Sequence, residues 1–271
     1  MLIVYADGIG TAKIPPEDER SILLTVAKAC AESLRGKGHH VGVLKAEWPA
    51  SMATVGGPLS WVNAAYRGVL AVDNILADHP GEKIILLGYS GGCRVVHDWL
   101  DTRPGQLDRI AAVGLMSDPF RPEGKSQDGR PPLHGWGICG QRPGPVPGRT
   151  FWTGWNADVI TCCSPDNPLR TGADVSDRIP GGFLDDVGDH LELGNWQLAN
   201  YMKVWRRDPR AYLLNLPRRM NDARWGIHGY LTGEHTRAYI EKRGHKWSLA
   251  EHLGLSVAWA VHTSGPVRDA G

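Results

Sequence analysis

Short apolar runs and amphipathic segments alternate along the first half of the chain. Apolar runs of about four to eight residues are typical of buried strands, and apolar positions that recur every three or four residues are typical of helices. This pattern predicts strands at 2–6, 41–44, 83–87, 110–116 and 150–155. It predicts helices from residue 16 or 17 to residue 35, at 61–78 and at 93–100. Strands that alternate with helices indicate a parallel sheet covered by helices on both faces.

The alternation ends beyond about residue 165. Segments 196–206 and 209–221 have helical patterns with many basic and aromatic residues, which indicates a helical insertion. A last helix is expected directly after Ser248, because Ser248 and Glu251 have the spacing of a capping box. We therefore expect three parts, which are a first part of the core, 1–164, a helical insertion, 165–227, and a last part of the core, 228–271.

Composition narrows the class of protein. The 271 residues carry a net charge of +1, and 22% of them are charged. The chain therefore lacks the strong electrostatic field that would favour binding to nucleic acid or to an anionic membrane. No apolar run approaches the length of a transmembrane helix. The five cysteines are odd in number and lack metal-ligand spacing, so we expect reduced thiols, no metal site and synthesis in a cytosol. Residues 1–6 have the pattern of a core strand and not of a signal peptide.

A candidate nucleophile follows the apolar run at 83–87. Ser90 lies in the sequence Gly-Tyr-Ser-Gly-Gly at 88–92, and a helical pattern begins at residue 93. A Gly-x-Ser-x-Gly turn between a strand and a helix is typical of the nucleophile elbow of an α/β-hydrolase, which holds its serine in a strained turn. Glycines flank the serine because strand and helix nearly collide there. The pattern therefore predicts Ser90 as a nucleophile.

A nucleophilic serine needs a histidine base and a carboxylate that orients it, and in this fold the three follow in the order Ser, Asp, His. The candidate acids are Asp118, Asp158 and Asp166. A Pro-Asp-Asn-Pro turn explains Asp166 without catalysis. The late histidines are His228, His235, His245, His252 and His262, of which the last two fall on or at the end of the expected final helix. The residues alone leave His228 and His235, both expected on a loop, as nearly equal candidates.

Together these motifs resemble those of the cutinase-like serine esterases of the α/β-hydrolase superfamily. The likeness is greatest to the lysin B group, the mycolylarabinogalactan esterases of mycobacteriophages. Residues 88–92 are similar to the Gly-Tyr-Ser-Gln-Gly elbow of that group, although Gly91 stands where the group has glutamine. Residues 118–121 resemble its Gly-Asn/Asp-Pro-x-Arg segment. A helical insertion between the catalytic acid and the histidine is also a trait of the group.

The same resemblance selects one acid and one base. Residues 156–162 resemble the stretch that holds the family's catalytic aspartate, which favours Asp158. Residues 235–239 resemble the family's late histidine followed closely by tyrosine, which favours His235. The implied triad is therefore Ser90, His235 and Asp158, with the backbone N–H groups of Gly91 and Ile9 as the oxyanion hole. No cofactor or metal is implied.

The resemblance also implies a substrate and a setting. The expected substrate is a lipid ester, in which mycolic acid is bound to cell-wall arabinogalactan. A groove for a long acyl chain is expected to include some of Trp136, Trp152, Trp155, Trp196 and Trp205. We expect a monomer with no nucleic-acid partner and no integral membrane segment, made in the host cytoplasm and acting on the cell envelope after release at lysis. The alternatives are a general cutinase-like or lipase-like carboxylesterase and a non-catalytic binding protein with this fold.

Overall fold

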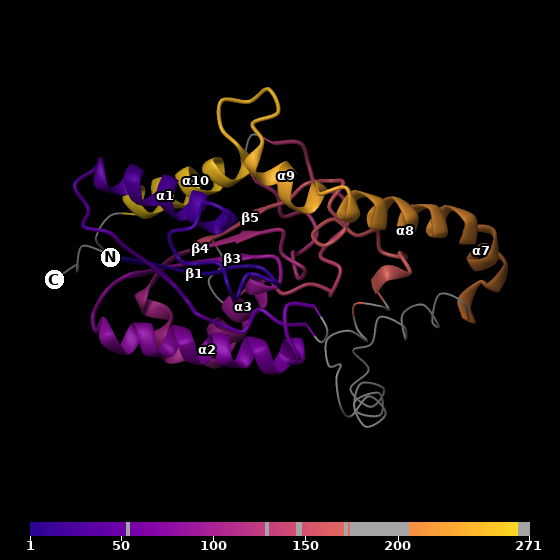
Figure 1. Ribbon diagram of the computed structural model, residues 1–271. Helices are drawn as coiled ribbons and strands as arrows, with labels where there is room; N and C mark the ends of the chain where they lie inside the picture. The colour runs from indigo at the N-terminus through magenta and orange to yellow at the C-terminus, as the bar shows by residue number, and fades with distance from the viewer. Residues whose placement is uncertain (53–54, 128–129, 145–147, 171–172, 174–205, 265–271) are drawn as a thin grey trace.

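A parallel sheet forms the centre of the molecule (Figure 1). The computed structural model of the chain describes residues 1–52, 55–127, 130–144, 148–170, 173 and 206–264. Within these residues, five strands pair in the order β2-β1-β3-β4-β5, and every pairing is parallel. The strands are β1 (Leu2–Ala6), β2 (Gly42–Lys45), β3 (Ile84–Tyr89), β4 (Ile110–Met116) and β5 (Thr150–Thr153).

Helices cover both faces of this sheet, as Figure 1 shows. On one face lie α1 (Ile22–Arg35) and α10 (Leu249–Thr263), and on the other lie α2 (Trp61–Asp78) and α3 (Gly92–Thr102). A short 3-10 helix, η1 (Pro104–Arg109), leads into β4. The remaining helices, α7 (Pro209–Leu214), α8 (Leu216–Leu231) and α9 (Glu234–Ile240), follow one another at the end of the sheet that holds the loops after β3 and β4. The predicted parallel sheet flanked by helices is confirmed.

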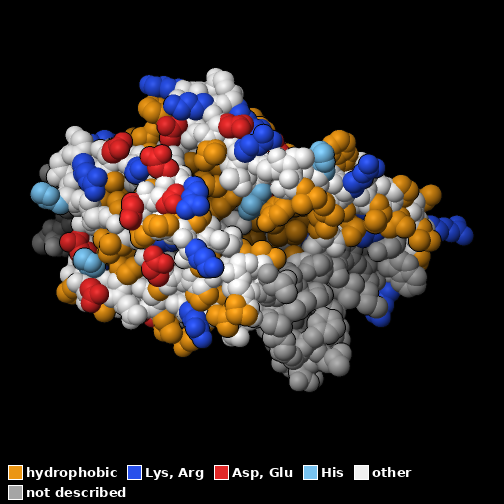
Figure 2. Space-filling model, viewed as in Figure 1, with side chains coloured by type: hydrophobic (Ala, Val, Ile, Leu, Met, Phe, Trp, Pro, Cys, Tyr) orange, Lys and Arg blue, Asp and Glu red, His pale blue; other side chains and the backbone are white. Residues whose placement is uncertain are grey.

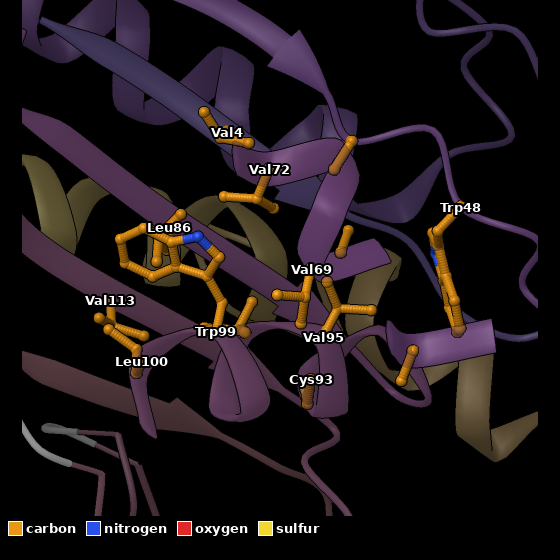
Figure 3. Packing of buried hydrophobic residues seen from close by; sticks show 14 of the residues in the cluster. Val4, Trp48, Val69, Val72, Leu86, Cys93, Val95, Trp99, Leu100 and Val113 are labelled. Atoms are coloured by element: carbon orange, nitrogen blue, oxygen red, sulfur yellow. The ribbon is translucent and has the colours of Figure 1, made fainter. Parts of the chain in front are cut away.

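Alternating side chains of the strands divide the core into two layers. In β1, Val4 points toward α2 and α3, whereas Ile3 and Tyr5 point toward α1 and α10. Figure 3 shows the first layer, in which apolar side chains of α2 and α3 pack against the sheet. A side chain at Gly68 of α2 would lie 2.6 Å from the Val95 side chain of α3, so the glycine lets the two helices approach closely. This packing holds α3, and the turn before it, against the end of β3.

Two element boundaries differ from the sequence prediction. Helix α1 begins at Ile22 and not at residue 16 or 17, because Ser21 has an extended backbone and its side chain accepts a hydrogen bond from the Leu24 N–H. The predicted helix at 209–221 is two helices with Asn215 between them, and the second continues to Leu231. The predicted helix at 196–206 lies almost entirely outside the described residues. Among the helices that the structure describes, none is long and apolar enough to cross a membrane.

Candidate active site

The turn between β3 and α3 holds Ser90 in a strained conformation. Its φ angle is +52°, which costs a non-glycine residue about 1–3 kcal/mol. The Ser90 N–H donates to the Met116 carbonyl at 3.0 Å, and the Ser90 carbonyl accepts from the Cys93 N–H at 3.0 Å. The first bond ties the turn to the end of β4 and the second to the start of α3. Ser90 is thereby fixed at the carboxyl edge of the sheet, where active sites of open parallel sheets lie.

The flanking glycines are required by close backbone contacts. A Cβ atom at Gly88 would lie 2.8 Å from the Cα of Cys93 in α3. A Cβ atom at Gly92 would lie 2.1 Å from the Ala6 carbonyl oxygen at the end of β1. Both neighbours are main-chain atoms, which a side-chain rotation cannot move away. The predicted close approach of the backbone segments at this turn, which leaves no room for a side chain, is therefore present on both sides of Ser90.

One histidine and one aspartate complete a hydrogen-bond chain with Ser90. His235 Nε2 lies 2.9 Å from Ser90 Oγ, and His235 Nδ1 lies 3.0 Å from Asp158 Oδ1 and 3.1 Å from Oδ2. Asp158 follows β5 and is fully buried, whereas Ser90 and His235 are 9% and 8% exposed. The structure thus brings together the three residues Ser90, His235 and Asp158.

The environment of Asp158 keeps its carboxylate charged. Burial acts to raise the pKa of Asp158, but the adjacent His235 and the hydrogen bonds it receives outweigh burial and hold the pKa below its usual range. Besides His235, the donors are the Ser117 hydroxyl at 2.5 Å, the Tyr239 hydroxyl at 2.6 Å and the Ile160 N–H at 3.1 Å. A buried carboxylate with this set of donors can remain ionised and can stabilise an imidazolium ion.

Aromatic rings fix the position of His235. The ring of Tyr89 stacks on the imidazole with centroids 5.4 Å apart, and its hydroxyl donates to the His235 carbonyl at 2.6 Å. The ring of Tyr230 lies 4.9 Å from the imidazole on a tilted plane. Burial and the Asp158 charge raise the pKa of both tyrosines, so their hydroxyls stay protonated near neutral pH.

The alternative acids lie in other contacts. Asp118 is buried and accepts hydrogen bonds from His97 Nε2 and Trp152 Nε1, both at 3.0 Å. Asp166 forms an ion pair with Arg218 of α8. Neither carboxylate contacts His235, which is bonded to Asp158. The structure therefore places only Asp158, of the three candidate aspartates, beside the histidine.

The expectation that His228 and His235 lie on a loop is wrong. His228 lies in α8 and is exposed, and His235 lies in the first turn of α9. Gly233, with φ +84°, separates the two helices and turns the chain back toward the sheet. Of the other late histidines, His245 is exposed and His262 faces His39. The short helix α9 holds the imidazole of His235 beside the hydroxyl of Ser90.

The predicted oxyanion donors lie next to each other. A Cβ atom at Gly91 would lie 3.5 Å from the backbone nitrogen of Ile9, and 2.5 Å from Cγ1 of the Ile9 side chain. In the described part of the chain, neither N–H donates a hydrogen bond to another protein group. The Ile9 side chain occupies the space that a side chain at residue 91 would need. A glutamine at this position, as in the lysin B group, would require the Ile9 side chain to move.

An apolar cavity of about 680 Å³ opens beside Ser90. Figure 2 shows hydrophobic side chains gathered along α8, one of the helices that border it. Apolar residues of its wall come from separate parts of the chain and include Ile9, Met52, Trp61, Ile138, Val159 and Ile227. A cavity with this size and lining suits an aliphatic or aromatic group.

The predicted tryptophan groove is wrong where the structure describes it. Trp136, Trp152 and Trp155 do not line the cavity. Instead, Trp136 and Trp155 lie under the guanidinium groups of Arg170 and Arg243, and Trp152 donates to Asp118. Trp196 and Trp205 lie outside the described residues. The tryptophan in the wall is Trp61, whose indole N–H donates to the Gly91 carbonyl at 3.1 Å.

Cysteine labelling tests the position of this cavity. Cys139 is half-buried and lines it, whereas the other four cysteines are buried. Burial raises the pKa of Cys30 and of Cys162 to about 12 and that of Cys163 to about 11, so these thiols stay protonated at pH 8. A bulky maleimide should therefore label Cys139 first and lower hydrolysis of long-chain esters by roughly tenfold.

The matched control is the Cys139→Ser variant, which should keep its activity in the presence of the reagent. Peptide mass mapping identifies the labelled cysteine, and a p-nitrophenyl palmitate assay measures the loss of activity. First labelling of a buried cysteine, or full activity after complete labelling of Cys139, would contradict this description of the cavity.

The sequence prediction missed two residues that contact Asp158, namely Ser117 and Tyr239. Ser117 is not among the residues predicted from the sequence, and Tyr239 enters only through the family resemblance of residues 235–239. A signal for Ser117 does exist, because it follows an apolar strand directly, as Ser90 does. The sequence could not show that its hydroxyl reaches Asp158, since β4 and the loop after β5 meet only in the folded sheet.

Comparisons with known proteins identify the fold. No protein-family model and no curated protein sequence matches the chain. The structure of lysin B from Mycobacteriophage D29 superposes with a TM-score of 0.52 at 15% identity, over 95% of this chain and 98% of that one. An acetylxylan esterase matches with a TM-score of 0.45 at 17% identity, over 60% of this chain and 86% of the other. A cutinase-like protein from Cryptococcus sp. matches with a TM-score of 0.41 at 16% identity, over 59% and 78%. With its parallel sheet and flanking helices, the chain has the cutinase-like α/β-hydrolase fold.

Proposed function

We propose that the chain is a serine carboxylic-ester hydrolase that acts through Ser90, His235 and Asp158. The observation that carries this proposal is the continuous hydrogen-bond chain from Ser90 Oγ through His235 to a buried, charged Asp158. Such a chain makes a serine hydroxyl nucleophilic, because the histidine accepts its proton and the aspartate stabilises the resulting imidazolium. An ester is the expected substrate of this arrangement at the mouth of an apolar cavity.

The proposed reaction has two stages. Ser90 Oγ attacks the ester carbonyl carbon while His235 Nε2 takes the hydroxyl proton, and the N–H groups of Gly91 and Ile9 bind the resulting oxyanion. Collapse of this intermediate breaks the bond to the alcohol, which receives the proton from His235. Water then attacks the acyl-enzyme with His235 as base, and the carboxylic acid leaves with Ser90 restored.

The cavity supports an apolar acyl group as the part of the substrate that the protein recognises. Its described walls are mostly apolar, and it lies directly beside Ser90. The narrower proposal is that the acyl group is a mycolic acid bound to arabinogalactan, as the sequence resemblance to the lysin B esterases implies. The narrower proposal includes action of a monomer on the cell envelope after lysis. Agreement of the fold with lysin B over most of both chains is consistent with it.

The test is a series of p-nitrophenyl esters from acetate to palmitate, with labelling by a fluorophosphonate. We expect hydrolysis that is greater for the longer esters and a single label on Ser90. Release of free mycolic acid from isolated mycolyl-arabinogalactan would support the narrower substrate. Hydrolysis of the simple esters without such release would favour a general cutinase-like carboxylesterase. A folded protein with neither turnover nor label would favour a non-catalytic binding protein.

A further inference from the structure

A second serine occupies the end of the neighbouring strand in the same backbone conformation as Ser90. Ser117 directly follows β4, and its φ angle is +52°, as it is at Ser90. Tyr89 and Met116, the residues before the two serines, are partners in the β3–β4 register. The Ser117 N–H donates to the Thr153 carbonyl at the end of β5, at 2.9 Å. Two adjacent strands therefore end in a strained serine, and the nucleophile accounts for only one of them.

The buried side chain of Ser117 lies between the acid and the base. Its hydroxyl donates to Asp158 Oδ2 at 2.5 Å and lies 3.1 Å from His235 Nδ1. The Tyr239 hydroxyl donates to the same oxygen at 2.6 Å. The other oxygen, Oδ1, accepts from the Ile160 N–H at 3.1 Å and faces His235 Nδ1 at 3.0 Å. The two hydroxyls thus hold one carboxylate oxygen, while both oxygens lie within hydrogen-bond distance of His235 Nδ1, at 3.0 and 3.1 Å.

We propose that Ser117 and Tyr239 are positioning residues for the Asp158–His235 pair. This inference rests on the proposed function and extends it. A carboxylate can rotate about its terminal torsion, and two hydroxyls on Oδ2 fix that rotation with both oxygens facing the imidazole. They also draw negative charge away from the imidazole, which limits how tightly the pair binds a proton. The strained backbone at residue 117 directs the hydroxyl to this position. Strain of this kind persists where the surrounding structure or a function requires it.

Paired variants at residue 117 separate this role from a structural one. Ser117→Ala and Ser117→Gly both remove the hydroxyl, but glycine adopts positive φ angles without strain. Ser117→Gly should therefore fold more stably than Ser117→Ala and still lose roughly 10- to 100-fold in kcat, with KM nearly unchanged. Tyr239→Phe should give a loss of the same order. Tyr5→Phe is the control, since its buried hydroxyl donates to the Pro16 carbonyl and has no contact with the pair.

The pH profile gives a second readout. Removal of either hydroxyl leaves more charge on the carboxylate, so the pair binds its proton more tightly and the acidic limb of kcat/KM should move up by about half a pH unit. Among the described residues, the other titratable groups against the pair are Tyr89 of β3, Tyr230 of α8, Tyr239 of α9 and Cys162, whose pKa burial raises to about 12. Burial raises the pKa of each of these tyrosines, so none changes its charge near neutral pH.

The Nδ1 proton of His235 gives a readout without turnover. Proton NMR of the wild type should show it at low field, and its resonance should shift and its exchange become faster in Ser117→Gly and Tyr239→Phe but not in Tyr5→Phe. A Ser117→Gly protein with unchanged kcat, pH profile and resonance would overturn the proposal. Absence of ester hydrolysis in the wild type would instead count against the proposed function, and the resonance would still decide whether the hydroxyls position the pair.

Discussion

Ester hydrolysis should fall by roughly 10³-fold or more when Ser90 is replaced by alanine, because alanine has no hydroxyl to form the proposed acyl-enzyme. The fold should be nearly unaffected. Ser90 is held by backbone hydrogen bonds to Met116 and Cys93, which alanine retains, and its side chain is bonded only to His235 in the described structure. The measurement is kcat/KM for p-nitrophenyl butyrate together with the midpoint of urea unfolding.

Fluorophosphonate labelling provides the control for this result. The wild type should take up one label, and Ser90→Ala should take up none although its circular dichroism is unchanged. Ser117→Ala should retain the label on Ser90, even though it also loses a buried serine hydroxyl. A normal rate in Ser90→Ala, or a label at another serine, would exclude Ser90 as the nucleophile.

Asp158→Asn should lower kcat by about 10⁴-fold, the loss expected when an amide replaces the carboxylate of a serine triad. An amide cannot accept the imidazole proton and both hydroxyl protons in the present arrangement, so His235 is held in the wrong tautomer or turned away from Ser90. It also carries no charge to stabilise the imidazolium. The effect should appear in kcat with little change in KM, since Asp158 is fully buried and does not line the cavity.

Asp166→Asn is the matched control for this substitution. It makes the same chemical change at a half-exposed aspartate whose partners are Arg218 and, at 3.9 Å, Arg219, so the rate should stay within about twofold of the wild type. Asp118→Asn is a second comparison, because it disturbs a buried aspartate–histidine contact that lacks a serine. A severe loss in Asp166→Asn with an active Asp158→Asn would reverse the assignment of the acid.

The turn that holds Ser90, the proposed nucleophile, could be predicted from the sequence because its constraints are local. An apolar strand, a glycine on each side and a helical pattern all lie within a few residues of Ser90, and the structure shows each contact that they imply. Helix α2 and strand β4 have the predicted boundaries for a similar reason, since capping residues and uninterrupted apolar patterns define their ends. Local chemistry of this kind needs no knowledge of how distant segments meet.

The proposed acid, Asp158, and the proposed base, His235, could not be identified among the candidate residues from such local signals. Asp118 and Asp158 both follow strands, and only the assembled sheet shows that Asp118 turns toward His97 while Asp158 faces His235. The helical positions of His228 and His235 give opposite exposures, which depend on the bend at Gly233. The cavity wall is assembled from many separate segments, so tryptophan content could not identify it. Contacts between segments that are far apart in the sequence determine the partners of the aspartates, the exposure of the histidines and the wall of the cavity.

Tyr230 belongs both to the wall of the cavity and to the surroundings of the imidazole. If the substrate binds as proposed, its acyl chain would contact this ring, which in turn contacts the imidazole of His235, the proposed base. The length of the substrate would then be expressed in the rate of turnover and not only in the strength of binding. Substrate selectivity would then depend on kcat as well as on binding, because Tyr230 of α8 contacts both the cavity and the imidazole of His235.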